Sequence, residues 1–559
     1  MPETWSDLAR RAATLPPSDF AALWESQDDE ATRRELLRGR FRWDLEGFCR
    51  FCWPDRFNLP FNALHHDLFD VAQSREAWDV RTGTLRDAVA APRGYAKSTI
   101  STFALVVHRI VYGLEAFVVV ASAESELAED FSRDLLEAFR DKESPLSELY
   151  GPFAVTGGVE GWRVSVRGAP PVAFLPRSER SAIRGRKHPT RGIRPTLIVL
   201  DDAEDKLRVL NPRLRNFTWS WLTKDVAKAG RKEGGTDIWV RGTVLHQYAM
   251  LARLVGGKEH GWQARKYKAI VRWPERADLW ERCRAIWTDL TLGEHRAPMA
   301  RAFFEQHRAE MERGAEVLDP EVEDLFRLHE QIWAEGLAAF LQEKQNDPID
   351  PSARVFDPER WARFRVEGDE LIVHGTGRRV PIWSLRRTLW WDPTVGGPSS
   401  DYGAIAVGGR DGFGYTYVLD LWMQQAPPDA QLAACWTLAE RWRIAQGGFE
   451  DNGFQELVAK ALPREREERR EAGRFWRFEL VGEPSTTNKE QRIAGIQPDA
   501  ANGWLLFSDR LPAELVQQAE SFPTGDHDDG LDAVERVHTA LGGTPIELSQ
   551  EPWWEARGR

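Results

Sequence analysis

The sequence predicts an α/β protein with two sheets, the first with a parallel core and the second mixed. Three observations support this prediction. Apolar runs rich in β-branched residues alternate with helical patterns over residues 87–242. Apolar runs joined by short turns follow over residues 387–421. At 559 residues the chain is also too long for a single hydrophobic core.

The elements can be taken in order along the chain. Residues 1–60 read as charged helices that Pro16-Pro17 interrupts, and a helix is expected from Thr99 to Tyr112. Asp347-Pro-Ile-Asp-Pro351 ends a charged, helix-rich stretch. Strands are predicted at 88–91, 116–121, 163–167, 172–175, 197–200, 237–242, 387–391, 403–407 and 415–421. The resulting division is a helical segment (1–60), a first domain (61–350), a linker or hinge (351–385), a second domain (386–545) and a tail (546–559).

Composition excludes some classes of protein. The net charge of -12 argues against a wholly basic nucleic-acid coat but permits a local basic channel. Four cysteines in so long a chain indicate a reducing compartment. Cys49 and Cys52 have the spacing of half a zinc site, although an apolar helix face explains them better. We expect no signal peptide and no membrane span, and therefore a cytoplasmic protein.

A phosphate-binding loop is predicted at Ala91-Pro-Arg-Gly-Tyr-Ala-Lys-Ser-Thr99, between a strand and a helix. Lys97 would reach the terminal phosphates of ATP, Ser98 would ligate Mg²⁺, and amides at the helix start, from Gly94 through Ala96 to Thr99, would cradle oxygens. Arg93 could add a guanidinium from within the loop. Ala91 and Ala96 replace the usual glycines, which permit close backbone approach.

Carboxylates that complete this site follow the strand at 197–200. We assign Asp201 to the metal, while Asp202 or Glu204 would orient the attacking water, and the sequence leaves these two open. The basic stretch 177–187 lies between the motifs. It is either a solvated loop, or a source of an arginine finger or of DNA contacts. Arg184 is our candidate for the finger, with Arg177 and Arg180 as the alternatives.

Separated acids in the second domain predict a metal-dependent nuclease. Asp392 ends a strand, Glu450 follows a probable strand, and Asp529 precedes an apolar-patterned helix. Three such acids can hold two Mg²⁺ or Mn²⁺ ions for phosphodiester cleavage. Asp451 could replace Glu450, and Asp528 could replace Asp529. Other acids of this domain, Asp401 and Asp420 among them, are expected to lie outside the site, and Asp529 or Asp532 could instead cap the last helix.

The order of these motifs resembles the large terminase subunit of tailed bacteriophages. The likeness runs from about residue 61 to 537 and rests on Pro92–Thr99, Ile183-Arg-Gly185, Leu197–Asp202, Gly242-Thr243, Gln342–Pro348, Asp392-Pro, Glu450-Asp-Asn452, Asn488–Ile493 and His527-Asp-Asp529. The resemblance implies an N-terminal P-loop (ASCE) ATPase domain and a C-terminal RNase H-like nuclease domain. It also implies a pentameric ring on a portal protein and a small terminase subunit that selects the genome.

The sequence therefore predicts an ATP-driven translocase of double-stranded viral DNA that also cuts it, acting in the host cytoplasm. ATP and Mg²⁺ are the expected cofactors, and Mn²⁺ is expected to support the nuclease. A helicase–nuclease of DNA repair, and a structural adaptor with a decayed ATP site, are the alternatives. Adenine recognition has only Phe61-Asn62 and His65-His66 as candidates.

Overall fold

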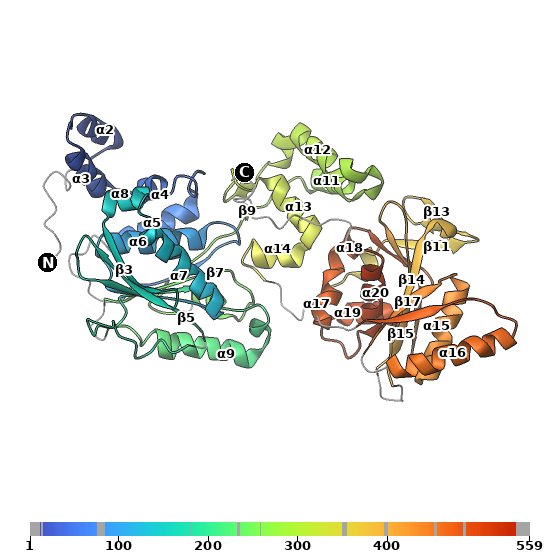
Figure 1. Ribbon diagram of the computed structural model, residues 1–559. Coiled ribbons are helices and arrows are strands. Elements are labelled where there is room, and N and C mark those ends of the chain that lie inside the picture. Colours follow the sequence, from blue (N-terminus) through green and yellow to red (C-terminus); the bar gives the residue numbers. More distant parts are fainter. Residues whose placement is uncertain are drawn as a thin grey trace.

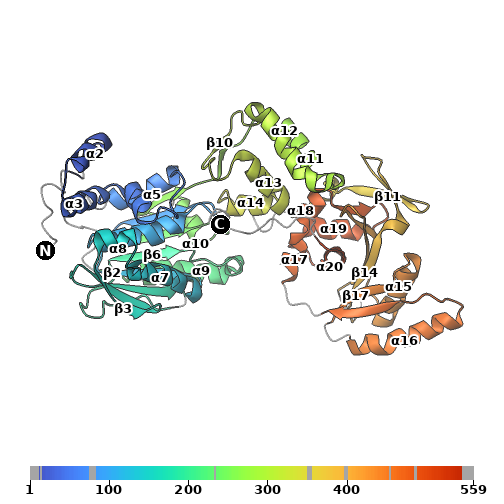
Figure 2. The same cartoon turned by 45° about the horizontal axis from the view of Figure 1, so that its top comes forward.

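The chain forms two sheet-containing lobes with a group of helices between them (Figures 1 and 2). The computed structural model describes residue 12 and residues 15–74, 84–179, 181–231, 235–257, 259–348, 355–395, 401–451, 455–483 and 488–543. The predicted tail at 546–559 lies outside the described residues. Among the described helices, none is both long and apolar enough to cross a bilayer.

The first sheet has a parallel core, as the sequence predicts. Its strands run in the order β3-β4-β5-β2-β6-β7-β1-β8, and only the pairs β3–β4 and β4–β5 are antiparallel. The central strands β2 and β6 are buried along their whole length, which explains their continuous apolar sequence. The strands are β1 (Arg86–Ala90), β2 (Phe117–Ser122), β3 (Phe153–Gly158), β4 (Gly161–Val166), β5 (Val172–Ser178), β6 (Leu197–Asp201), β7 (Asp237–Gly242) and β8 (Gln263–Lys266).

Helices cover both faces of this sheet. Apolar side chains of α4 to α8 pack on one face, and those of α10 and the π-helical segment Trp221–Val226 pack on the other. Cys49 and Cys52 lie buried on α4 within the first of these cores. Their spacing therefore places them on the apolar face of a helix, as expected. The helices are α2 (Pro17–Glu25), α3 (Glu30–Phe41), α4 (Leu45–Cys52), α5 (Ala63–Ser74), α6 (Leu105–Val111), α7 (Ser125–Arg140), α8 (Pro145–Tyr150), α9 (Pro212–Ser220) and α10 (Met250–Val255).

A fully buried cation ties this helical layer to the sheet. Arg109 on α6 contacts Glu115 at 2.7 Å and Asp237 on β7 at 3.1 Å, and all three side chains are solvent-inaccessible. Removal of the arginine would leave two carboxylates in a medium that solvates charge poorly.

The segment that leads out of the first domain is hydrogen-bonded to the predicted phosphate loop. It follows helices that lie between the lobes, α11 (Ala277–Thr288), α12 (Arg296–Met311), α13 (Leu325–Glu335) and α14 (Leu337–Glu343), beside the short strands β9 (Ile270–Arg272) and β10 (Glu316–Val317). Arg93 N–H donates to Glu343 O at 2.9 Å, and Lys344 Nζ donates to Arg93 O at 3.1 Å. Asn346 Oδ1 accepts from Val244 N at 2.8 Å.

The second sheet is mixed, as predicted, with strand order β13-β12-β11-β19-β16-β15-β14-β17-β18. Helices α15 and α16 pack on one face, and α17 to α20 pack on the other. The elements are β11 (Arg363–Glu367), β12 (Glu370–Val373), β13 (Arg379–Pro381), β14 (Arg386–Asp392), β15 (Gly403–Arg410), β16 (Thr416–Gln424), β17 (Gln446–Glu450), β18 (Glu479–Glu483), β19 (Leu505–Ser508), α15 (Pro428–Arg441), α16 (Gln455–Glu471), α17 (Lys489–Gly495), α18 (Gln497–Ala501), α19 (Ala513–Ser521) and α20 (Asp529–Ala540).

Part of the segment expected to be a linker is ordered sheet. Strands β11 to β13 fall within residues 351–385 and extend the second sheet through the pairing of β11 with β19. These strands are short and carry charged residues on their exposed face, so their sequence lacks the continuous apolar run that marks β2 or β6.

Candidate functional site

The predicted phosphate loop lies at the carboxyl end of β1 and leads into a helix, as the sequence pattern requires. Its backbone adopts positive φ at Gly94 (86°) and at Ala96 (51°). The second value belongs to the left-handed region that glycine tolerates best. Ala96 therefore keeps the backbone shape of a glycine-rich loop without the residue that adopts it most readily.

Lys97 extends from this loop toward the ends of two neighbouring strands. Its ammonium lies 3.7 Å from Asp202 Oδ2 and 3.5 Å from Thr243 Oγ1, just beyond β6 and β7. Both contacts are long, and the lysine side chain is only 7% exposed. A buried ammonium with two such partners is suited to bind an anion that approaches the loop.

Asp201, the last residue of β6, is fully buried and holds two hydroxyl groups. Ser98 Oγ donates to its Oδ1 at 3.0 Å, and Thr102 Oγ1 donates to its other oxygen. Burial raises the pKa of Asp201 and the neighbouring Asp202 raises it further, while Lys97 and the two hydroxyl groups oppose the rise. Carboxylate and hydroxyl oxygens together form the donor set that Mg²⁺ prefers.

The two candidates for the water-orienting acid have different surroundings. Glu204 accepts hydrogen bonds from Met250 N at 2.6 Å and Leu251 N at 2.9 Å, so it caps the start of α10. Asp202, with φ of 43°, instead faces Lys97 across the loop. The geometry favours Asp202 for the role of water-orienting acid, because backbone amides already bind both oxygens of Glu204.

The two arginine candidates lie on the surface. Arg93 is 63% exposed, and its guanidinium is 3.6 Å from Glu343 Oε2. Arg184 is exposed in the loop between β5 and β6. Arg180 lies outside the described residues.

A pocket adjoins the phosphate loop and includes some of the residues considered for adenine recognition. Phe61 and His65 line it together with Gly94 and Tyr95 of the loop. His65 Nε2 donates to Tyr95 O at 3.0 Å, and burial lowers the pKa of His65 to about 4, so its imidazole is neutral. The side chain of Asn62 is bonded to Asp319.

The second set of acids converges at one end of the mixed sheet. Strands β14 and β17 are parallel neighbours, with Trp391 opposite Phe449, so Asp392 and Glu450 follow at adjacent strand ends. Asp529 begins α20, and Asp532 lies one turn further along the same helix. Elements from distant parts of the sequence thus bring their carboxylates together.

Lys489 at the start of α17 lies among these carboxylates. Its Nζ is 2.9 Å from Asp528, 3.4 Å from Asp532, 3.5 Å from Asp529 and 3.9 Å from Asp392. Burial opposes the charge of Lys489, but Asp392 and the other acids raise its pKa above the usual value. Four carboxylates around a single ammonium attract further cations. The carboxylate oxygens are donors that suit Mg²⁺ or Mn²⁺.

The pKa of Asp392 is raised mainly by burial. Burial raises its pKa to about 8; Lys489 opposes the rise, while Asp532, Glu450 and Asp529 add to it. Glu450 is itself buried at the end of β17. Of the two alternatives, Asp528 contacts Lys489 directly, whereas Asp451 is partly exposed and pairs its backbone N–H with Glu483 O.

Comparison with known proteins finds matches among solved structures. No family model matches the sequence, and no curated protein does. The large terminase of a thermophilic bacteriophage in complex with ADP is 11% identical, with 87% of this chain and 100% of that chain covered and a TM-score of 0.40. The HK97 bacteriophage large terminase is 14% identical, with 89% and 99% covered and a TM-score of 0.29. The chain is similar to large terminases. A Thermus phage large terminase nuclease domain also matches, at 16% identity, with 35% of this chain and 100% of that chain covered and a TM-score of 0.24.

Three residues of these sites were not singled out from the sequence. Thr102 lies four residues after Ser98, on the same side of the helix, and that spacing is a usable signal. Asp532 lies three residues after Asp529, where the sequence indicates only a helix cap. Lys489 belongs to a motif of the terminase resemblance, but no pattern in the sequence indicates that it lies among the acids.

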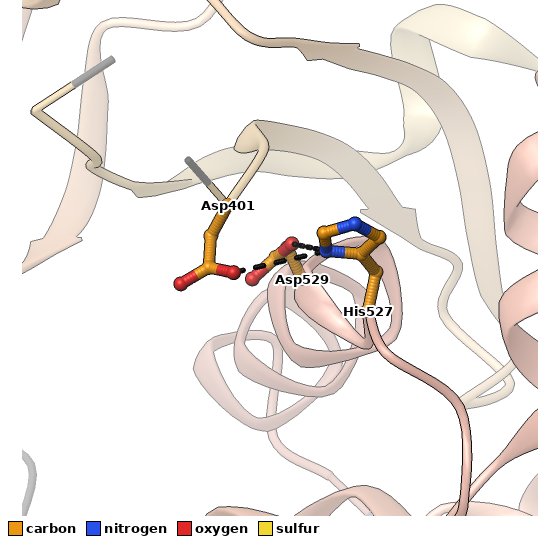
Figure 3. A group of neighbouring side chains, drawn as sticks. All are labelled: Asp401, His527 and Asp529. Carbon is orange, nitrogen blue, oxygen red and sulfur yellow. Dashed lines mark ion pairs between the residues drawn. The ribbon is translucent and has the colours of Figure 1, made fainter. Parts of the chain in front are cut away.

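Asp401 was expected to lie outside the site, but the structure places it beside Asp529. Figure 3 shows it facing His527 and Asp529, and its carboxylate lies 3.7 Å from His527 Nδ1. Asp420 does lie elsewhere, where it accepts hydrogen bonds from Arg441 and Trp442 at 2.9 Å each.

Proposed function

We propose that this chain is a phage terminase large subunit, which moves double-stranded viral DNA into procapsids with ATP and cuts it with a metal-dependent endonuclease. One observation supports this most. A single chain carries a phosphate-binding loop at a parallel sheet and a carboxylate cluster at a mixed sheet. Together the two sites supply the energy source and the cutting chemistry that packaging requires.

The first site would bind ATP with Mg²⁺. Lys97 and the loop amides from Gly94 to Thr99 would neutralise phosphate charge, and Ser98 with Asp201 would hold the metal ion. Asp202 would orient the attacking water, with Glu204 as the alternative. Arg93 and Arg184 would supply positive charge to the transferred phosphoryl group, Arg184 toward a neighbouring subunit.

The second site would cleave DNA. Asp392, Glu450 and Asp529 would hold divalent cations, with Asp451 and Asp528 as the alternatives. Bound Mg²⁺ or Mn²⁺ would lower the pKa of water and stabilise the negative charge on the leaving oxygen. Lys489 lies among these acids, and its ammonium would pair with a phosphate of the DNA backbone that reaches them.

The remaining parts of the proposal concern organisation. The domains would be 61–350 for the ATPase and 386–545 for the nuclease, with 1–60, 351–385 and 546–559 as flanking and linking segments. The partners would be double-stranded DNA, a portal protein, a small terminase subunit and further copies of this chain in a pentameric ring. The site of action would be the host cytoplasm.

A reciprocal pair of variants tests the proposal. Lys97→Ala should abolish ATP hydrolysis and leave plasmid cleavage with Mn²⁺ intact, because it removes charge from the first site alone. Asp392→Asn should do the reverse. ATP-dependent DNA packaging is then measured with purified procapsids. ATP-dependent strand separation would favour the helicase–nuclease alternative, and a wild-type chain with neither activity would favour the adaptor.

A further inference from the structure

A cavity of about 430 Å³ lies where the helices between the lobes meet the second lobe. This volume falls within the range of roughly 300–1,000 Å³ that is usual for ligand pockets. Helices α11, α13 and the start of α14 line one side, and α18 and the segment before β11 line the other. Helices α13 and α18 lie side by side here (Figure 2). An occupant of the cavity would therefore contact the second lobe and the helices that connect it to the first.

Aromatic side chains line much of this cavity. They are Trp273, Trp280, His329, Trp333, Phe356 and Trp361. Trp280 stacks on His329 with ring centroids 3.5 Å apart, so this part of the wall is held in place by its own packing. Trp273 and Leu337 line the cavity and remain exposed, which places them at its mouth. The cavity thus presents a fixed apolar surface that suits an aromatic occupant.

The described part of the chain ends close to this cavity. Gly543 N donates to His538 O at 3.0 Å, and His538 Nε2 lies 2.7 Å from Asp499 Oδ2 on α18. The other residues of α18 line the cavity, namely Gln497, Pro498, Ala500 and Ala501. The end of α20 and the cavity therefore adjoin the same short helix, which with its side chains is about 10–12 Å wide.

Residues 544–559 follow Gly543, and their sequence matches the chemistry of the cavity. They include the run Glu551-Pro-Trp-Trp-Glu555, which supplies two adjacent indole rings between two carboxylates. An extended chain spans about 3.3 Å per residue, so the stretch from Gly543 to Trp553 reaches up to roughly 33 Å, well beyond the width of one helix. Arg360 lines the cavity and its guanidinium is largely exposed beside Asp357, so it can pair with a carboxylate that flanks the rings.

We propose that Trp553 and Trp554 occupy this cavity in their own chain, so that residues 544–559 latch the second lobe to helices α11 and α13. Burial of two indole rings against aromatic walls offsets the cost of ordering the segment. The latch does not depend on the proposed function, because it requires neither ATP nor DNA. If that function holds, release of the latch frees the nuclease domain to move relative to the ATPase domain.

Disulfide trapping in the full-length chain tests the proposal. Leu337→Cys at the mouth of the cavity is combined with Ala556→Cys, just beyond the two tryptophans. The four native cysteines are buried, which leaves the two introduced thiols to react with each other. In a mild oxidant the intramolecular disulfide should form at least about tenfold faster than at an exposed site outside the cavity, because docking holds the two thiols together. Non-reducing electrophoresis and intact mass measure the rate and the product.

Met299→Cys with Ala556→Cys is the matched control. Met299 lies on α12 outside the cavity and is 47% exposed, against 49% for Leu337. In the Leu337 pair, the added changes Trp553→Ala and Trp554→Ala should slow the reaction to the rate of this control. Equal rates at Leu337 and Met299, or a Leu337 rate that the two alanines leave unchanged, would overturn the proposal. A disulfide-linked dimer as the main product would also overturn it, since the segment of a second copy would then occupy the cavity.

Discussion

Asp392→Asn is expected to stabilise the metal-free protein while it abolishes DNA cleavage. The folded chain holds the Asp392 carboxylate in a mostly buried position, 18% exposed, near three further acids. Burial and these acids raise its pKa from 3.8 to about 8 although Lys489 opposes the rise. The folded state therefore binds this proton more tightly than the unfolded state. As a result, the stability of the wild-type chain falls as the pH rises from about 4 toward 8, and it changes little above that range.

The magnitude follows from the size of the pKa shift. Between about pH 6 and pH 9, roughly two pH units lie below the folded pKa of Asp392, where only the folded state holds the proton. At 1.36 kcal/mol per unit, the free energy of unfolding of the wild-type chain falls by about 2.7 kcal/mol over this interval. Relaxation of the neighbouring charges reduces this value, so we expect a pH-dependent difference of about 1–3 kcal/mol. Asparagine has no proton to lose, and the variant should therefore gain relative to the wild type as the pH rises.

Urea unfolding in EDTA at both pH values measures this difference. The sign should reverse with saturating Mn²⁺, because a cation at about 100 times its Kd stabilises the wild-type fold by about 2.7 kcal/mol and the variant by less. The reasoning would be refuted by a variant that is less stable than the wild type in EDTA at the higher pH. Equal stabilisation of both chains by Mn²⁺ would also refute it.

Four further substitutions test the first domain. Ala96→Gly should raise the free energy of unfolding by roughly 0.5–1 kcal/mol, because φ of 51° suits glycine better than alanine, and a lower value in thermal melts would contradict the strain argument. Asp202→Asn should slow ATP hydrolysis at least about 100-fold, whereas Glu204→Gln should cost mainly stability, about 1 kcal/mol from the weakened helix cap; the reverse ranking in steady-state assays would exchange their roles. Arg109→Met should lower stability by about 3–5 kcal/mol in chemical denaturation, and a loss below about 1 kcal/mol would mean that its acid partners are solvated.

The central strands and the ends of β6 and β14 were predictable from the sequence. Their apolar runs stop at Asp201 and Asp392, and a buried run that ends in a carboxylate is a local signal. The edge strands β11 to β13 were not predictable in the same way. Charged residues interrupt the apolar pattern of β11 and β13, and β12 has only four residues, of which three are apolar and buried.

The partners of the site residues depend on tertiary structure. Glu204 looks like a catalytic acid in the sequence because it follows Asp201, yet its oxygens meet the amides of Met250 and Leu251, which a later segment supplies. Lys489 reaches Asp392 only because α17 packs beside α20, and α20 in turn packs on β14. Sequence spacing carries no information on contacts of this kind.

The segment at residues 343–346 is hydrogen-bonded to the phosphate loop at several points, which has a mechanical consequence. The backbone carbonyl of Glu343 accepts from Arg93 N–H, the side chain of Lys344 donates to the Arg93 carbonyl, and the side-chain oxygen of Asn346 accepts from Val244 N. Any displacement of the loop must therefore either break these hydrogen bonds or move the segment at residues 343–346 together with the loop.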